Sequence, residues 1–400
     1  MGILIRKNHQ IIFFTRMAKL AFVLLLVSMS SSFVDTIWAV YLESFLHNTS
    51  LVGFFSGALS VLSFISFFLL VPFVAKSRKS VLYSTSLILL ALFYFLVGIN
   101  KNFVLFAIFS FFITILFTLR ITSFGIILRD KSNSKYLSRN EGLMYTFSNV
   151  AWVIGPLLAG FIFVKGSISL VFIFASLFLL LAFLFFKFSE IYDGNLVRHH
   201  SPDIFRNFLI FFKNHDMRIA YLLGMGVTFW WALIYLYMPL YILQSNLDKT
   251  WIGIFLFLVA IPLIIFEYPA SKFGGKHGFR LLFKTGYFIL FLTPLVIFFI
   301  NNIFVVFSLL ILASFGIAMI EPTTEAYFFD ILKNKKDTNK FYGPYNTAIE
   351  AGLITGKLIP AAFLIFLPFK YVFLIFSLSM LIFFAVSFKA KKVVEMRKKG

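Results

Sequence analysis

The sequence predicts an all-α polytopic membrane protein with twelve transmembrane helices in two pseudo-symmetric six-helix bundles. The first reason is composition: 60% of the 400 residues are hydrophobic, 59 are Phe, and the mean hydropathy is +0.95. A water-soluble domain could not bury that much apolar surface. The second reason is that the apolar residues fall into runs of roughly 20, the length of a helix that crosses about 30 Å of hydrocarbon. The third is a repeat that spans half the chain.

The apolar runs define the predicted spans and domains. The spans are 20–42, 51–75, 80–99, 103–128, 142–164, 168–188, 219–243, 251–270, 281–300, 303–331, 342–367 and 370–388. An N-terminal bundle is expected at 1–188 and a C-terminal bundle at 219–400. The long polar segment 189–218 is predicted to be a cytoplasmic linker. Its stretch 204–213 is amphipathic enough to lie along the membrane surface.

The half-chain repeat is visible at an offset of 200 residues. The matched pairs are Asp130 and Asp330, Tyr145 and Tyr345, Ala151 and Ala351, and Ile154 and Ile354. At nearly the same offset Arg120 is replaced by Glu321, with the opposite charge. A weak repeat that carries ionisable residues inside hydrophobic segments is typical of secondary transporters.

The distribution of basic residues predicts the orientation. When residues near the ends of spans are counted with the adjacent loop, thirty of the 36 Lys and Arg residues fall on one side of the predicted spans, four on the other and two in the interior of spans. Such a bias marks the basic side as cytoplasmic. We therefore expect a multi-pass protein of the cell membrane with both termini cytoplasmic, and we interpret the net charge of +20 as topology and not as a nucleic-acid surface. The chain has no cysteine, so disulfides and cysteine-based chemistry are excluded, and no metal site is predicted.

The fifth apolar run carries the most specific motif, glycine and proline at the spacing G-x8-G-x3-G-P-x2-G-G, with alanine at two glycine positions. Its residues are Gly142, Ala151, Gly155, Pro156, Ala159 and Gly160. Small residues allow close helix packing, and proline kinks a helix. With twelve spans, a repeat and a central linker, the whole chain resembles the major facilitator superfamily, and most closely its drug:proton antiporter branch.

Two further features are similar to that family. Its cytoplasmic loop motif, G-x-L-A-D-R-x-G-R-K, keeps a basic residue, a glycine and a second basic residue at 271–280, and little beyond positive charge at 74–80. The resemblance also implies an arginine linked to proton handling in the fourth helix, and Arg120 matches it by position. Finally, it implies that helices 1, 4, 7 and 10 line a central cavity.

Seven ionisable residues inside the apolar runs are singled out, because a charge costs on the order of 2.5–3.5 kcal/mol at the bilayer centre. Such side chains should face a partner or a water-filled cavity. Glu267 is favoured as a structural salt bridge. The other six are predicted to form the substrate or proton pathway: Asp35, Arg120, Glu321, Glu325, Glu350 and Lys357.

Spacing adds detail to this prediction. Glu321 and Glu325 are four residues apart and share a helix face, as do Glu350 and Lys357 at seven. A carboxyl that is protonated part of the time can couple substrate movement to a proton. Aromatic side chains on the first and seventh helices are candidates to stack on a flat substrate or to hold a cation. They are Trp38, Tyr41, Trp230, Trp231 and Tyr235.

These features predict a secondary transporter that works by alternating access, with proton-coupled export of small lipophilic or amphipathic compounds favoured. No cofactor is predicted; a proton gradient, or else a sodium gradient, supplies the energy, because the P-loop pattern is absent. The expected partners are the lipid bilayer and a small-molecule substrate, without nucleic acid, and the chain is expected to be a monomer. One alternative is an importer or facilitator of a sugar, amino acid or organic anion, with Arg120 and Lys357 binding the anion. Another is a membrane receptor or scaffold. No catalytic constellation points to an enzyme.

Overall fold

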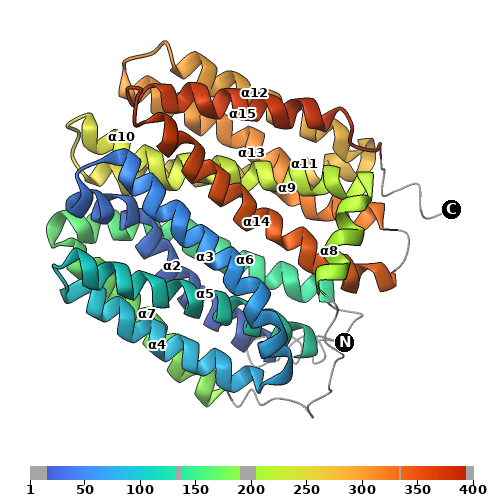
Figure 1. Ribbon diagram of the computed structural model, residues 1–400, viewed down its shortest axis with the longest axis horizontal. Helices are drawn as coiled ribbons and strands as arrows, with labels where there is room; N and C mark the ends of the chain where they lie inside the picture. Colours follow the sequence, from blue (N-terminus) through green and yellow to red (C-terminus); the bar gives the residue numbers. More distant parts are fainter. Residues whose placement is uncertain (1–15, 132–136, 190–203, 333–334, 393–400) are drawn as a thin grey trace, which may run out of the picture. The chain divides into compact units, whose positions relative to one another are not determined.

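The computed structural model describes residues 16–131, 137–189, 204–332 and 335–392. Each predicted span corresponds to a helix in it, the seventh being formed by three consecutive segments (Figure 1). The helices are α2 (Arg16–Leu46), α3 (Thr49–Lys76), α4 (Lys79–Ile99), α5 (Phe103–Lys131), α6 (Leu137–Lys165), α7 (Ile168–Phe188), α8 (Ile204–Lys213), α9 (His215–Ala232), the π-helix η2 (Leu233–Tyr237), α10 (Met238–Gln244), α11 (Thr250–His277), α12 (Phe279–Ile297), α13 (Ile303–Ile331), α14 (Lys335–Phe363) and α15 (Tyr371–Ser387).

The helix lengths confirm the prediction of an all-α fold with twelve membrane helices. Among the described residues, ten helical stretches are long and apolar enough to cross a membrane, with α9, η2 and α10 counted as one. The apolar helix α15 is shorter, at 17 residues, and α14 begins with a lysine-rich turn. The predicted tails at 1–15 and 393–400, and most of the predicted linker, lie outside the described residues. The predicted amphipathic stretch of the linker is helix α8.

The half-chain repeat extends to the way helices begin. Asn102 precedes α5, and its side-chain oxygen accepts hydrogen bonds from the backbone N–H groups of Val104 (2.8 Å) and Leu105 (3.2 Å). Asn302, 200 residues later, caps α13 in the same way through Phe304 (2.9 Å) and Val305 (3.4 Å). Each cap satisfies N–H groups that have no partner within the helix. The fourth helix of each half therefore starts at equivalent positions.

The described residues group into two compact units. The first contains 16–37 and 65–189, and the second contains 38–64 and 204–392. The end of α2 and the first part of α3 thus belong with the C-terminal helices, although the sequence places them in the N-terminal half. The predicted boundaries at 188 and 219 stay a prediction for the division of the chain into bundles.

In the first unit α4 packs against both α5 and α7. The ring of Tyr83 contacts Phe124 of α5 and Phe186 of α7, with centroid distances of 5.4 and 4.8 Å. The glycine motif brings α6 against α2, because a side chain at Gly155 would overlap Ser32 Oγ. Pro156 and Gly160 are also buried, and Gly142 lies in α6. The motif therefore has the packing role that small residues usually have between membrane helices.

In the second unit α12 lies beside α15 and α13 (Figure 1), and α9 packs along α14. Glycines set the closest approaches. A Cβ atom on Gly286 of α12 would lie 2.7 Å from the carbonyl oxygen of Gly316 in α13. One on Gly352 of α14 would overlap Thr228 Oγ1 and the carbonyl oxygen of Met225 in α9. Backbones in contact gain van der Waals energy, which is a main source of helix association in lipid.

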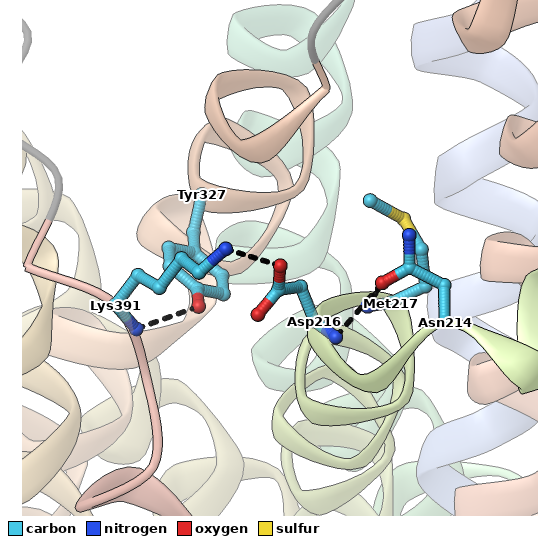
Figure 2. Close-up of polar contacts among 5 residues, drawn as sticks. All are labelled: Asn214, Asp216, Met217, Tyr327 and Lys391. Carbon is cyan, nitrogen blue, oxygen red and sulfur yellow. Dashed lines mark hydrogen bonds and ion pairs between the residues drawn. The ribbon is translucent and has the colours of Figure 1, made fainter.

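One end of the second unit is held by polar contacts (Figure 2). Asn214 caps α9 by accepting hydrogen bonds from the backbone N–H groups of Asp216 (2.9 Å) and Met217 (3.4 Å). Lys391, which follows α15, forms an ion pair with the carboxylate of Asp216. Its backbone N–H donates to the hydroxyl of Tyr327 at 2.9 Å. These contacts connect the segment after α15 to α9 and α13.

A glycine substitution tests the packing of α9 on α14. Gly352→Ala should lower the free energy of unfolding by about 1–3 kcal/mol, because the added methyl group meets backbone atoms that cannot move aside. Gly343→Ala in the same helix is the matched control, since a Cβ atom there has nothing within 4 Å. The measurement is the midpoint of thermal unfolding of the purified protein. Equal midpoints for the two variants would contradict the packing described.

Candidate functional site

Arg120 lies in the interior of the first unit. Its residue is 7% exposed, and its guanidinium carbon is 4.6 Å from the centroid of the Phe117 ring, a cation–π distance. It is within electrostatic range of Tyr83 and Tyr94 of α4 and of Asp35 of α2. Its Nε atom is buried and has no hydrogen-bond partner among the described residues. Arg120 is thus a buried cation with donor capacity left over.

Asp35 differs from Arg120 in its surroundings. Its side chain is exposed on the surface of the first unit, although its charge is felt by both Arg120 and Tyr94. Both predicted residues of the first unit are therefore in one electrostatic neighbourhood. Tyr83 and Tyr94, which the sequence analysis did not single out, also belong to this neighbourhood. The hydroxyl group of Tyr83 is buried and has no hydrogen-bond partner among the described residues.

Glu321 is a half-buried carboxylate of the second unit with one buried oxygen atom. It lies in α13 ten residues before the end of the helix, about 15 Å along the axis at 1.5 Å per residue. The indole N–H of Trp231 in α9 donates a hydrogen bond to its Oε1 at 3.4 Å. Its Oε2 is buried and has no hydrogen-bond partner among the described residues. Unpaired buried carboxylate oxygens are costly as ions, so this one calls for a ligand or a proton.

The aromatic partner of Glu321 lies next to a break in helix geometry. Trp231 contacts Tyr235, with 5.6 Å between ring centroids, and both side chains are half-buried. Tyr235 belongs to the π-helix η2, which separates α9 from α10. Single π-helical turns inside α-helices are frequent at functional sites. The pair forms an aromatic surface beside the carboxylate.

Glu325 follows Glu321 by one turn and has a different environment. Its Oε1 accepts a hydrogen bond of 2.9 Å from the hydroxyl of Tyr342 in α14. The shared helix face predicted from the four-residue spacing therefore does not give the two carboxylates the same partners. Glu321 is the one with an oxygen left without a partner among the described residues.

Glu267 of α11 is part of the same region, and its interpretation as a structural salt bridge stays a prediction. It is within electrostatic range of Glu321, and no ion pair links it to a base among the described residues. A salt-bridge partner for Glu267 is therefore absent from the described part of the chain. Its proximity to Glu321 comes from the packing of α11 on α13, which the sequence could not reveal.

Glu350 and Lys357 face α3 within the second unit. Ser63 Oγ donates to Glu350 Oε1 (2.9 Å), and Lys357 Nζ donates to Ser60 Oγ (2.9 Å). The hydroxyl of Tyr237 donates to the carbonyl oxygen of Lys357 at 2.5 Å. The predicted shared face on α14 thus meets a serine face on α3. The spacing of three and four residues among the serines of α3 was the signal that could have predicted it.

The other aromatic candidates are involved in packing. Trp38 donates its indole N–H to Ser56 Oγ at 3.2 Å, and Tyr41 is 8% exposed and contacts Phe45. Trp230 has 0% exposure, so none of its ring surface is open to a substrate in this structure. Trp231 and Tyr235 are the candidates that the structure places beside an ionisable group.

Comparison with known proteins identifies the family. The sequence model of the Major Facilitator Superfamily matches residues 20–266 and 220–400. No curated protein matches the chain at a significant level.

Solved structures agree on the fold. The nucleoside transporter NupG superposes with a TM-score of 0.73 and 12% sequence identity, covering 94% of this chain and 100% of that chain. A bacterial homologue of the human lysosomal transporter Spinster, in an inward-facing and occupied conformation, has a TM-score of 0.71 and 12% identity, covering 93% and 95%. At such identities a structural likeness shows the fold alone. The family match over most of the sequence, together with the helices described above, shows that this chain belongs to the Major Facilitator Superfamily of membrane transporters.

Proposed function

We propose that this transporter is proton-coupled and that Glu321 carries the proton. The supporting observation is the buried Oε2 of Glu321, which has no hydrogen-bond partner among the described residues, while Oε1 accepts from Trp231. A proton on Oε2 would remove the charge that is costly in this position. A conformation that opens the site to water would favour its release. Protonation would then shift the balance between conformations, which is how an ion gradient drives alternating access.

The proposed substrate is a small, flat amphipathic compound with a hydrogen-bond donor or a positive charge. Trp231 and Tyr235 offer aromatic surface, and the carboxylate of Glu321 lies at its edge. Aromatic rings bind flat apolar groups and cations, and a carboxylate accepts hydrogen bonds from donors. A nucleoside, the substrate named for NupG, also has a flat ring with donors. The chemistry of the site therefore favours a compound with a flat aromatic ring over a free sugar.

Export through the cell membrane is the proposed direction. The resemblance of the Gly155-Pro156 motif to drug:proton antiporters supports it, because that branch exchanges protons for compounds leaving the cell. The excess of Lys and Arg on one side of the spans supports cytoplasmic termini. We further propose that the chain acts as a monomer.

A second candidate is uptake of an organic anion, and Arg120 is the observation that favours it. A buried guanidinium with an unpartnered Nε among the described residues can bind a carboxylate or phosphate group. The unpartnered hydroxyl of Tyr83, which lies in its electrostatic range, could donate a second hydrogen bond. In this case the anion, and not a proton, would compensate the buried charge.

Proton coupling is tested by replacing Glu321. In proteoliposomes with an entrapped pH dye, compounds that the wild type transports should move protons, and Glu321→Gln should abolish this movement because the side chain can no longer bind or release a proton. Glu325→Gln should lose less than about tenfold, the scale of one hydrogen bond, because Glu325 already has Tyr342 as a partner.

The same assay separates the alternatives. Proton movement that persists in Glu321→Gln would refute the assignment of Glu321. Transport that follows a sodium gradient and not a pH gradient would refute proton coupling itself. Glu43→Gln, which removes a carboxyl group near the end of α2, is the control for general damage to the protein.

Trp231→Phe tests the hydrogen bond to Glu321 separately from the aromatic surface. Phe retains a ring but has no N–H, so Oε1 loses its donor. The loss of one hydrogen bond to a carboxylate, about 1.5–3 kcal/mol, should lower the rate of proton-coupled transport roughly tenfold or more. Trp231→Phe with wild-type coupling would show that this hydrogen bond has no role.

Arg120→Lys tests the second candidate. Lysine keeps the charge but has no planar array of donors, so carboxylate compounds that raise the thermal midpoint of the wild type should do so at least about tenfold less tightly in the variant. The measurement is the midpoint over a concentration series of aromatic carboxylates. An identical dose dependence in both proteins would exclude Arg120 as the anion ligand.

A further inference from the structure

We propose that Glu267 and Glu321 form a carboxylate dyad that holds one proton between them. This inference rests on the proposed role of Glu321 and adds to it a second acid on a different helix. The dyad would make Glu267 the group through which the buried Glu321 exchanges its proton. Both residues belong to the second unit.

The register of α11 and α13 places the two acids at neighbouring levels. Three aromatic pairs connect the helices: Trp251 with Phe304, Phe255 with Phe307, and Phe266 with Phe315, with centroid distances of 5.2, 5.0 and 5.6 Å. Residue numbers increase together in the three pairs, so the two helices run parallel. The difference between the paired residue numbers falls from 53 to 49 along the helices. At the offset of 49 found for Phe266, the level of Glu267 lies near residue 316, about five residues from Glu321, or roughly 7–8 Å along the axis.

Within the described part of the chain, the electrostatic surroundings of Glu321 contain acids and no compensating base. The groups that face Glu321 are Trp231 from α9, as a hydrogen-bond donor, and Glu267 from α11. Its own helix adds Glu325, whose carboxylate accepts from Tyr342 of α14. Neither Glu267 nor Glu321 is in an ion pair within the described part of the chain. Ionising both carboxylates in one apolar region is unfavourable, so the pair with one shared proton has the lower free energy.

A third observation indicates where the shared proton would lie. The Oε2 atom of Glu321 is buried and has no partner among the described residues, so it is the place where a proton, and a hydrogen bond to a second carboxylate, would be satisfied. Glu267 and Glu321 are both half-buried, but their neighbours differ: Ile265 and Tyr268 beside Glu267 are 64% and 76% exposed, whereas Ile320 beside Glu321 is 0% exposed. The arrangement fits an inner acid, Glu321, that exchanges its proton through Glu267, which lies beside exposed residues.

Proline residues give both helices freedom to bend at the dyad. Pro269 follows Glu267 by two residues and Pro322 follows Glu321 directly. Each proline removes a backbone hydrogen bond and bends its helix. The two carboxylates can therefore approach or separate as the helices flex, without breaking further backbone hydrogen bonds.

The proton balance of the dyad is simple. With one proton the pair carries a charge of −1, and the O–H of one acid donates to the carboxylate of the other. Transfer of the proton from Glu321 to Glu267 leaves this charge unchanged. Loss of the proton from Glu267 to water then gives a pair with a charge of −2, which is the state expected when the site is hydrated.

Infrared difference spectroscopy of the purified full-length protein tests the dyad without any substrate. The carbonyl stretch of protonated carboxyl groups is recorded over a pH series, and the band lost in Glu321→Gln is assigned to Glu321. In Glu267→Gln the midpoint of that band should shift by about one pH unit or more, because the second titrating group has gone. Glu43→Gln removes another carboxyl group with a buried, unpartnered oxygen in the described residues and should leave the band unchanged.

The outcomes distinguish this inference from the proposed function. An unchanged midpoint in Glu267→Gln would overturn the dyad, even if Glu321→Gln abolishes proton-coupled transport. A shifted midpoint in a protein that moves no protons would support the dyad and refute the proposed function. If the thermal midpoint shows that Glu267→Gln does not fold, the same titration is carried out on Glu267→Asp. The shorter side chain changes the distance across the shared proton, so the midpoint of the Glu321 band should shift in this variant too.

Discussion

The constraint on which this structure depends is that lipid offers no hydrogen bonds. Every polar group inside the membrane must find its partner in the protein or remain costly. Most of the hydroxyl groups solve this locally, as when Thr114, Thr118 and Thr122 of α5 donate in turn to the carbonyl oxygen four residues earlier. Against this background, the buried atoms without hydrogen-bond partners among the described residues stand out. They include Glu321 Oε2 and Arg120 Nε, which belong to the proposed proton and anion sites.

The second unit combines dense packing with selected weak points. Glycines bring α12 to α13 and α14 to α9, so that backbones touch. Prolines and the π-helix η2 interrupt backbone hydrogen bonding at Glu267, Glu321 and Tyr235. Close packing transmits movement between helices, and interrupted hydrogen bonding tells where a helix can bend. The ionisable groups therefore lie on the parts of the helices that can change shape at the smallest cost.

The polar contacts between α3 and α14 show a different use of charge. Glu350 and Lys357 both contact serines of α3, and these contacts lie within one compact unit. Serine hydroxyl groups form hydrogen bonds with a carboxylate and an ammonium group that also lie within electrostatic range of each other. Such contacts can be exchanged for water more readily than a buried ion pair, because less electrostatic energy is lost on separation.

The sequence by itself determined the solvent, the number of helices, the half-chain repeat and the family, because runs of apolar residues and glycine spacing are local features of a chain in lipid. It also marked the candidate acids and bases, since an ionisable residue in an apolar run is conspicuous. Only the tertiary structure decided which of them meet. Glu325 is satisfied by Tyr342, whereas Glu321, one turn away, meets Trp231 and lies near Glu267. Spacing along one helix sets the face of a side chain, but its partner is set by the register of the neighbouring helix, which no pattern within a single segment contains.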